Sequence, residues 1–77
     1  MEQRAYTLKD EMYEWLLSEI KEAVVTGVPV AVDGRFYSLH NTEELKGVME
    51  NHYYMKSYTG DESGKIIRID FNHITSV

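Results

Sequence analysis

The chain has 77 residues, a formal net charge of −5 and no cysteine. Because soluble domains are usually about 100–200 residues long, we expect one small domain over residues 1–77. The lack of cysteine excludes a disulfide framework, a thiolate nucleophile and every cysteine-based zinc site. A composition that is 43% hydrophobic and 27% charged is typical of a globular protein and argues against disorder.

No apolar run approaches the roughly 18–20 residues that a membrane-spanning helix needs. The N-terminal stretch MEQRAYTLKDE lacks the apolar core of a signal peptide. We therefore expect a cytoplasmic protein with no membrane partner. The negative net charge opposes binding to the phosphates of nucleic acid.

The first predicted element is a helix that ends at Gly27. Thr7 can cap its N-terminus, and Asp10 completes a loose capping box. Gly27 can adopt the left-handed conformation that often follows a helix. One stripe of apolar residues at helical spacing is the predicted core face, and it comprises Leu8, Met12, Leu16, Ile20, Ala23 and Val24, flanked by Trp15.

The next segment, VPVAVDGRFYSLH, predicts a β-hairpin. Asp33-Gly34 favours a type I′ turn, in which both central residues have positive φ. A turn centred there pairs Val32 with Arg35, Val30 with Tyr37 and Val28 with Leu39. Pro29 has no N–H, and in this register the missing group points away from the partner strand. We therefore expect residues 28–32 to form an edge strand.

Asn41 is predicted to cap a second helix, whose apolar stripe comprises Leu45, Val48, Met49 and His52. Two more strands are predicted on either side of a loop over residues 60–64. Pairing Thr59 with Lys65 places six residues on one face: Tyr54, Lys56, Tyr58, Ile66, Arg68 and Asp70.

The predicted order is therefore helix–hairpin–helix–hairpin (αββαββ). The simplest closed arrangement is an α+β two-layer sandwich, with a four-stranded antiparallel sheet and both helices on one of its faces. Such a fold leaves the outer face of the sheet exposed.

The excess charge lies on the helices. Residues 1–27 carry six acids and three bases, and residues 40–52 carry three acids and one base. The hairpins have no net charge, so the exposed sheet face is predicted to be neutral and aromatic, as in many interfaces. The candidate interface residues are Phe36, Tyr54, Lys56, Tyr58, Ile66 and Arg68.

No motif indicates catalysis. His40, His52 and His73 do not have the spacing of a metal site, and no serine lies in a nucleophile motif. The glycines form no phosphate-binding loop. We therefore expect no catalytic, metal-binding or cofactor-binding residues, and we expect that the protein is not an enzyme.

These observations favour a small acidic protein-binding module that forms a homodimer through its aromatic sheet face or a free sheet edge. Small size and acidity also fit a bacterial or phage accessory or inhibitory protein that occupies a basic groove. The alternative is a single-stranded nucleic-acid-binding protein that stacks bases on Tyr54 and Tyr58 and holds phosphates with Lys56 and Arg68.

Overall fold

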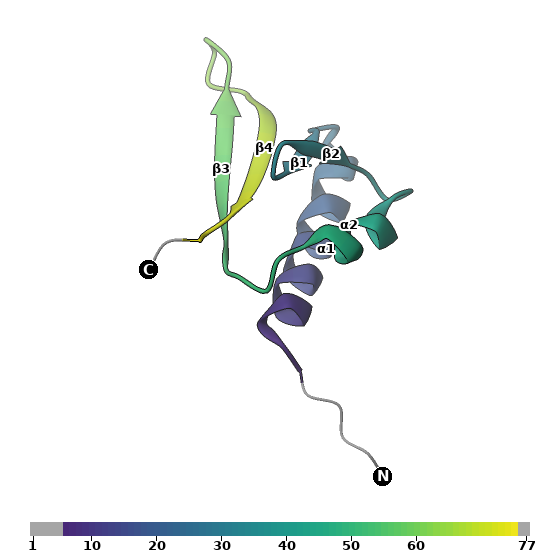
Figure 1. The fold of residues 1–77 in the computed structure, drawn as a ribbon. Coiled ribbons are helices and arrows are strands. Elements are labelled where there is room, and N and C mark those ends of the chain that lie inside the picture. Colours follow the sequence, from purple (N-terminus) through teal and green to yellow (C-terminus); the bar gives the residue numbers. More distant parts are fainter. Residues whose placement is uncertain (1–5, 76–77) are drawn as a thin grey trace.

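The computed structural model describes residues 6–75, so both ends of the predicted domain over residues 1–77 lie outside the described residues. The chain forms two helices and four strands (Figure 1). In chain order the elements are α1 (Leu8–Thr26), β1 (Val30–Val32), β2 (Arg35–Tyr37), α2 (Thr42–Val48), β3 (Tyr54–Gly60) and β4 (Ile66–His73). The predicted α+β class is confirmed.

The sheet is mixed, so the prediction of a purely antiparallel sheet is wrong. Its strand order is β2-β1-β4-β3. Each hairpin is antiparallel, but β1 and β4 lie parallel, with Val30 beside Ile69 and Val32 beside Phe71. The two hairpins therefore join along their β1 and β4 sides, which leaves β2 and β3 at the edges.

Helix α1 begins and ends where the sequence predicts. The Thr7 hydroxyl accepts a hydrogen bond from the Asp10 N–H, and the Asp10 carboxylate accepts one from the Thr7 N–H. Gly27 follows the helix with φ 76°. Leu16, Ile20 and Ala23 are buried as expected, but the prediction for Val24 is wrong, since its side chain is 48% exposed.

The first hairpin has the predicted turn and register. Asp33 and Gly34 have φ values of 50° and 85°, and Val32 pairs with Arg35 and Val30 with Tyr37. The ladder ends there, so the predicted pairing of Val28 with Leu39 is wrong.

The prediction that Pro29 marks a sheet edge is also wrong. Strand β1 lies between β2 and β4. The Pro29 carbonyl accepts a hydrogen bond from the Ile69 N–H at 3.0 Å. The hydrogen-bond ladder between β1 and β4 therefore starts at Pro29. A proline is compatible with the first position of an interior strand because the ladder there needs only its carbonyl.

Helix α2 starts after Asn41, but the asparagine side chain does not cap it. The Asn41 Oδ1 accepts a hydrogen bond from the Ser38 N–H at 2.7 Å and so closes the loop before the helix. Leu45 and Met49 are buried as predicted. The helix ends at Val48, which is exposed together with His52, so both are wrongly placed in the predicted stripe.

The predicted register of the second hairpin is wrong by three residues. Thr59 lies opposite Arg68 rather than Lys65, and the register shifts between Thr59 and Gly60. The Asp61 carboxylate accepts hydrogen bonds from the N–H groups of Ser63 and Lys65, which stabilises a longer loop. Because side chains alternate between faces, an odd shift moves every side chain of β3 to the opposite face.

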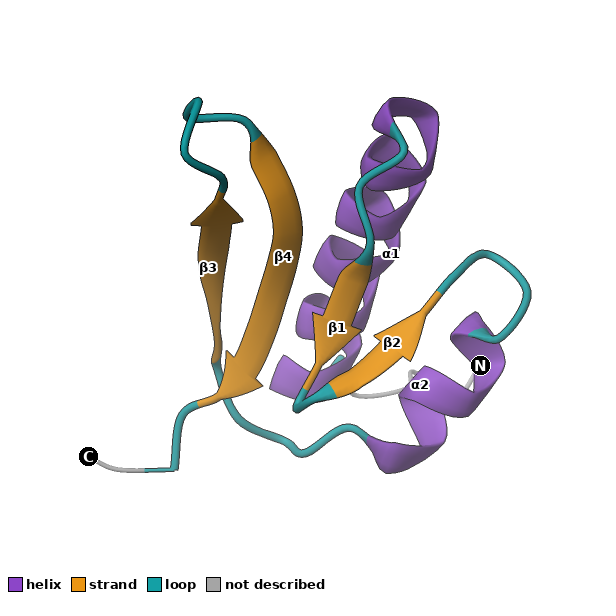
Figure 2. Cartoon of the chain, turned by 90° about the horizontal axis from the view of Figure 1, so that it is seen from above, coloured by secondary structure: helices purple, strands orange, loops and turns teal. Residues whose placement is uncertain are grey.

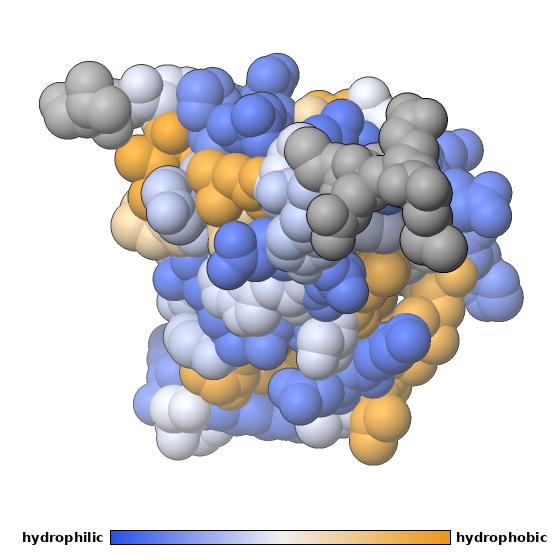
Figure 3. Space-filling view, turned by 90° about the horizontal axis from the view of Figure 1, so that it is seen from below, coloured by the Kyte–Doolittle hydropathy of each residue, from blue (hydrophilic) through white to orange (hydrophobic). Residues whose placement is uncertain are grey.

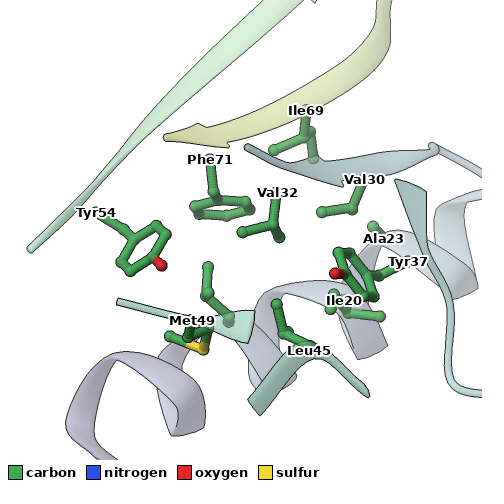
Figure 4. Packing of buried hydrophobic residues seen from close by; sticks show 11 residues of the cluster. Ile20, Ala23, Val30, Val32, Tyr37, Leu45, Met49, Tyr54, Ile69 and Phe71 are labelled. Atoms are coloured by element: carbon green, nitrogen blue, oxygen red, sulfur yellow. The ribbon is translucent and has the colours of Figure 1, made fainter. Parts of the chain in front are cut away.

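The core is one cluster formed by both helices and one face of the sheet, here called the inner face (Figure 4). Phe71, Leu16, Ile20, Leu45 and Val30 are its largest fully buried side chains. Buried residues from all six elements contribute to this cluster.

Candidate protein interface

The structure separates the six predicted interface residues. Phe36 and Arg68 lie on the outer face of the sheet, whereas the changed register places Tyr54, Lys56 and Tyr58 on the inner face beside Ile69 and Phe71. Ile66 lies at the start of β4, next to the register shift. The predicted aromatic patch is therefore not one surface.

Several side chains of the outer face contact one another, while Phe36 remains 51% exposed. The Arg68 guanidinium carbon lies 4.7 Å from the centre of the Phe36 ring, and its Nη2 lies 2.8 Å from Asp70 Oδ1. The hydrogen bond to Asp70 raises the pKa of Arg68. Ala31 is flanked by Phe36 and Asp70 in the sheet and is fully buried between them. This arrangement leaves little of the predicted neutral aromatic surface.

On the inner face, Lys56 joins β3 to α1. Its ammonium group forms an ion pair with the Glu19 carboxylate, and its Nζ lies 4.7 Å from the centre of the Tyr58 ring. The hydrogen bond to Glu19 raises the pKa of Lys56, and Tyr58 adds to the effect. Lys56 is thus neutralised within the chain, while the Tyr58 side chain remains 57% exposed.

Strand β3 presents a free row of backbone groups. The Ile74 N–H donates to the Tyr53 carbonyl at 2.8 Å, which makes residues 53 and 74 a hydrogen-bonded pair. Hydrogen-bonded and non-hydrogen-bonded pairs alternate in an antiparallel ladder. The N–H and C=O groups of Tyr54, Lys56 and Tyr58 consequently point away from β4, towards the open edge.

The two sheet edges differ in length and exposure. Strands β2 and β3 lie on opposite sides of the sheet, with β1 and β4 between them (Figure 2). Edge strand β2 has three residues, whereas β3 has seven and contains no proline. Short strands, prolines and free lysines protect natural edges against pairing. Strand β3 is neither short nor interrupted by proline; its features that limit pairing are the inward-facing Lys56, which is held by Glu19, and the register shift between Thr59 and Gly60 at its end.

The histidines do not form a metal centre. His52 and His73 stack with ring centres 5.9 Å apart, and His73 Nδ1 lies 2.9 Å from Asp33 Oδ1. Within residues 6–75 there is no group of three or more His, Cys, Asp or Glu residues placed to hold a metal ion.

Exposed hydrophobic residues occur in separate patches on the face that Figure 3 shows, where hydrophilic residues lie between them. Met55 and Tyr58, on opposite faces of β3, are both more than half exposed and flank its free edge.

No helix within residues 6–75 is long and apolar enough to cross a membrane.

The sequence predictions missed the ion pair between Glu19 and Lys56, which are 37 residues apart and carry no local signal of their contact. The lack of proline in the second hairpin predicted a free sheet edge there, and the structure identifies β3 as that edge strand.

Comparison of the chain with protein-family models, with curated proteins and with solved structures finds no match.

Proposed function

We propose that the chain is a protein-binding module that forms a homodimer by pairing the β3 strands of two copies. The observation that carries the proposal is the seven-residue, proline-free β3 at the sheet edge. In the two-layer arrangement, with both helices against the inner face, an added strand would extend the sheet without disturbing the core. Addition of a strand to an open edge is a common mode of protein recognition.

A two-fold axis near Ser57 gives the most favourable antiparallel pairing. It places Lys56 of one copy opposite Tyr58 of the other, and their backbone groups that face the open edge then form hydrogen-bonded pairs. Lysine and tyrosine already contact each other within one chain, with Nζ 4.7 Å from the ring centre. A register centred on Lys56 would instead oppose two lysines, which is unfavourable.

The charge distribution supports association at the sheet. The acidic excess lies in residues 1–27 and 40–52 rather than in β3, and Glu19, an acid of α1 that contacts β3, is paired with Lys56. The paired sheets would therefore meet without strong repulsion, while the acidic helices remain available to a further protein partner. We propose a cytoplasmic, non-enzymatic role of this kind, such as that of a bacterial or phage accessory protein.

The residues named for the nucleic-acid alternative do not form one accessible surface. Tyr54 is only 5% exposed, and Lys56 and Arg68 are held by Glu19 and Asp70. We therefore favour the protein-binding function.

The substitution Tyr58→Pro tests the proposal because it removes an N–H that faces the open edge but no hydrogen bond to β4. Wild type is expected to scatter light as a dimer, with twice the 9.0 kDa mass of the chain. Tyr58→Pro is expected to have the 9.0 kDa mass with an unchanged far-UV circular dichroism spectrum.

The matched control is Tyr58→Thr, which also removes the ring but keeps the N–H and is expected to remain largely dimeric. A wild-type mass of 9.0 kDa throughout the micromolar range would contradict the homodimer. A folded Tyr58→Pro variant that dimerises as well as wild type would exclude pairing through β3.

A further inference from the structure

A pocket of about 200 Å³ lies between the first hairpin, α2 and the start of β3. Its apolar wall comprises Val32, Leu45, Val48 and Met49, and its polar lining comprises Asp33, Arg35, Tyr37 and Tyr54. An apolar pocket with a few convergent polar groups is typical of a small-molecule site.

Two tyrosine hydroxyl groups belong to this pocket and lack acceptors. Tyr37 and Tyr54 are 6% and 5% exposed (Figure 4). The Tyr54 hydroxyl oxygen accepts a hydrogen bond from the Glu50 N–H at 2.9 Å, but neither hydroxyl proton is donated to another of the described residues. No side-chain oxygen or nitrogen of the described residues is both sealed from solvent and unpartnered, so the Tyr37 hydroxyl, which has no partner among these residues, reaches open space.

Buried hydroxyl groups are normally hydrogen-bonded, because an unused donor in an apolar environment is unfavourable. Burial is the main cause that raises the pKa of Tyr54, so this hydroxyl stays protonated and able to donate. Tyr37 thus offers one accessible donor to an acceptor atom, and Tyr54, which also lines the pocket, carries a second hydroxyl proton that no described residue accepts.

The charges around the pocket disfavour an ion. Asp33 is paired with His73 at 2.9 Å, and Arg35 is paired with Glu44 at 3.6 Å. One acid and one base therefore line the pocket, and each already has a partner. A neutral ligand matches this balance better than a carboxylate or an ammonium ion does.

We propose that this pocket binds a small uncharged molecule with an apolar body and a carbonyl-type acceptor, which the hydroxyl groups of Tyr37 and Tyr54 recognise. The pocket is smaller than the usual range of about 300–1,000 Å³ for drug-sized ligands, so the ligand is of fragment size. This site does not depend on the homodimer.

Acetophenone is a suitable probe, and ethylbenzene is its control because it has the same phenyl ring and a two-carbon side chain but no carbonyl group. The two compounds are titrated into isotope-labelled protein while the amide NMR signals are followed. Acetophenone is expected to shift the signals of Val32, Leu45 and Met49. It should bind about three- to tenfold more tightly than ethylbenzene, the range expected for a net hydrogen bond.

The substitution Tyr37→Phe removes one donor with little change of shape. It is expected to weaken acetophenone binding about three- to tenfold and to leave ethylbenzene binding unchanged. Tyr58→Phe is the matched control, because Tyr58 does not line the pocket, and it should affect neither compound. Tyr54→Phe gives a second test of the same recognition.

Three results would overturn the proposal as a whole, and a fourth would overturn the uncharged class of the ligand. The first is that millimolar acetophenone leaves the pocket signals unshifted, as expected if the hydroxyl groups bind only water. The second is equal affinity for acetophenone and ethylbenzene. The third is an equal loss of affinity for both compounds in Tyr37→Phe. Tighter binding of benzoate than of acetophenone would overturn the uncharged class.

Discussion

The substitution Leu16→Ala is expected to remove most of the stability of this domain. Leu16 is fully buried in the core cluster on the inner face. Replacing a buried leucine by alanine costs about 2–5 kcal/mol, because it loses apolar burial and leaves a cavity. In chains below about 70–80 residues, a single hydrophobic core rarely supplies more than about 3–5 kcal/mol of stability. Urea denaturation at one fixed protein concentration measures the loss.

Val25→Ala is the control for this change. It also truncates an apolar residue of α1, but the Val25 side chain is 87% exposed. We expect its free energy of unfolding to lie within about 0.5 kcal/mol of wild type. Equal destabilisation by the two substitutions would show that the orientation of α1 is wrong.

The substitution Phe71→Ala is expected to have an equal or larger effect. Phe71 is fully buried on β4, and its ring meets that of Trp15 edge-on, with ring centres 5.1 Å apart. Truncating a buried phenylalanine costs about 3–5 kcal/mol. Because Trp15 is the one tryptophan of the chain, its fluorescence reports the loss directly.

The same substitution at Phe36 tests the assignment of the two sheet faces. The Phe36 ring is 51% exposed and contacts Arg68 on the outer face. We expect Phe36→Ala to lower the free energy of unfolding by less than about 1.5 kcal/mol, because it removes only a cation–π contact and some surface packing. A larger loss of stability for Phe36→Ala than for Phe71→Ala would reverse the two faces.

Short-range signals predicted the local structure well. The capping box of Thr7 and Asp10, the helix end at Gly27 and the Asp33-Gly34 turn each depend on neighbouring residues. Such patterns are readable because the residues that form them lie within a few positions of each other. The hydrophobic stripe likewise identified Leu16 and Ile20 as core residues.

The contact that joins the two hairpins could not be predicted from such local patterns. The sequence contains no local mark of the parallel contact between β1 and β4, since Val30 and Ile69 are 39 positions apart. Pro29 was misread because its missing N–H excludes most interior positions but not the first of a strand. In the second hairpin, the longer loop that Asp61 stabilises and the register shift before Gly60 moved β3 to the opposite face.

These errors explain what became of the candidate site. The predicted interface depended on the register of the second hairpin. It was wrong because the observed register places Tyr54 and Tyr58 of β3 on the inner face. The expectation that the second hairpin offers an open edge depended only on the absence of proline and survives as the β3 edge. The pocket with Tyr37 and Tyr54 was not predicted, because it requires the contact between the two halves of the chain.

Amide hydrogen exchange at the β3 edge tests the proposed homodimer most directly. The N–H groups of Lys56 and Tyr58 face the open edge, whereas that of Ser57 faces β4. In a monomer, the first two exchange rapidly and the third slowly. Pairing of two β3 strands would protect all three.

We predict that the Lys56 and Tyr58 amides exchange slowly at millimolar protein concentration and become fast on dilution, while the Ser57 amide stays protected. Lys56 should also lose its protection in the Tyr58→Pro variant. Exchange of Lys56 and Tyr58 as fast as that of the exposed loop residue Glu62 at every concentration would contradict pairing through β3.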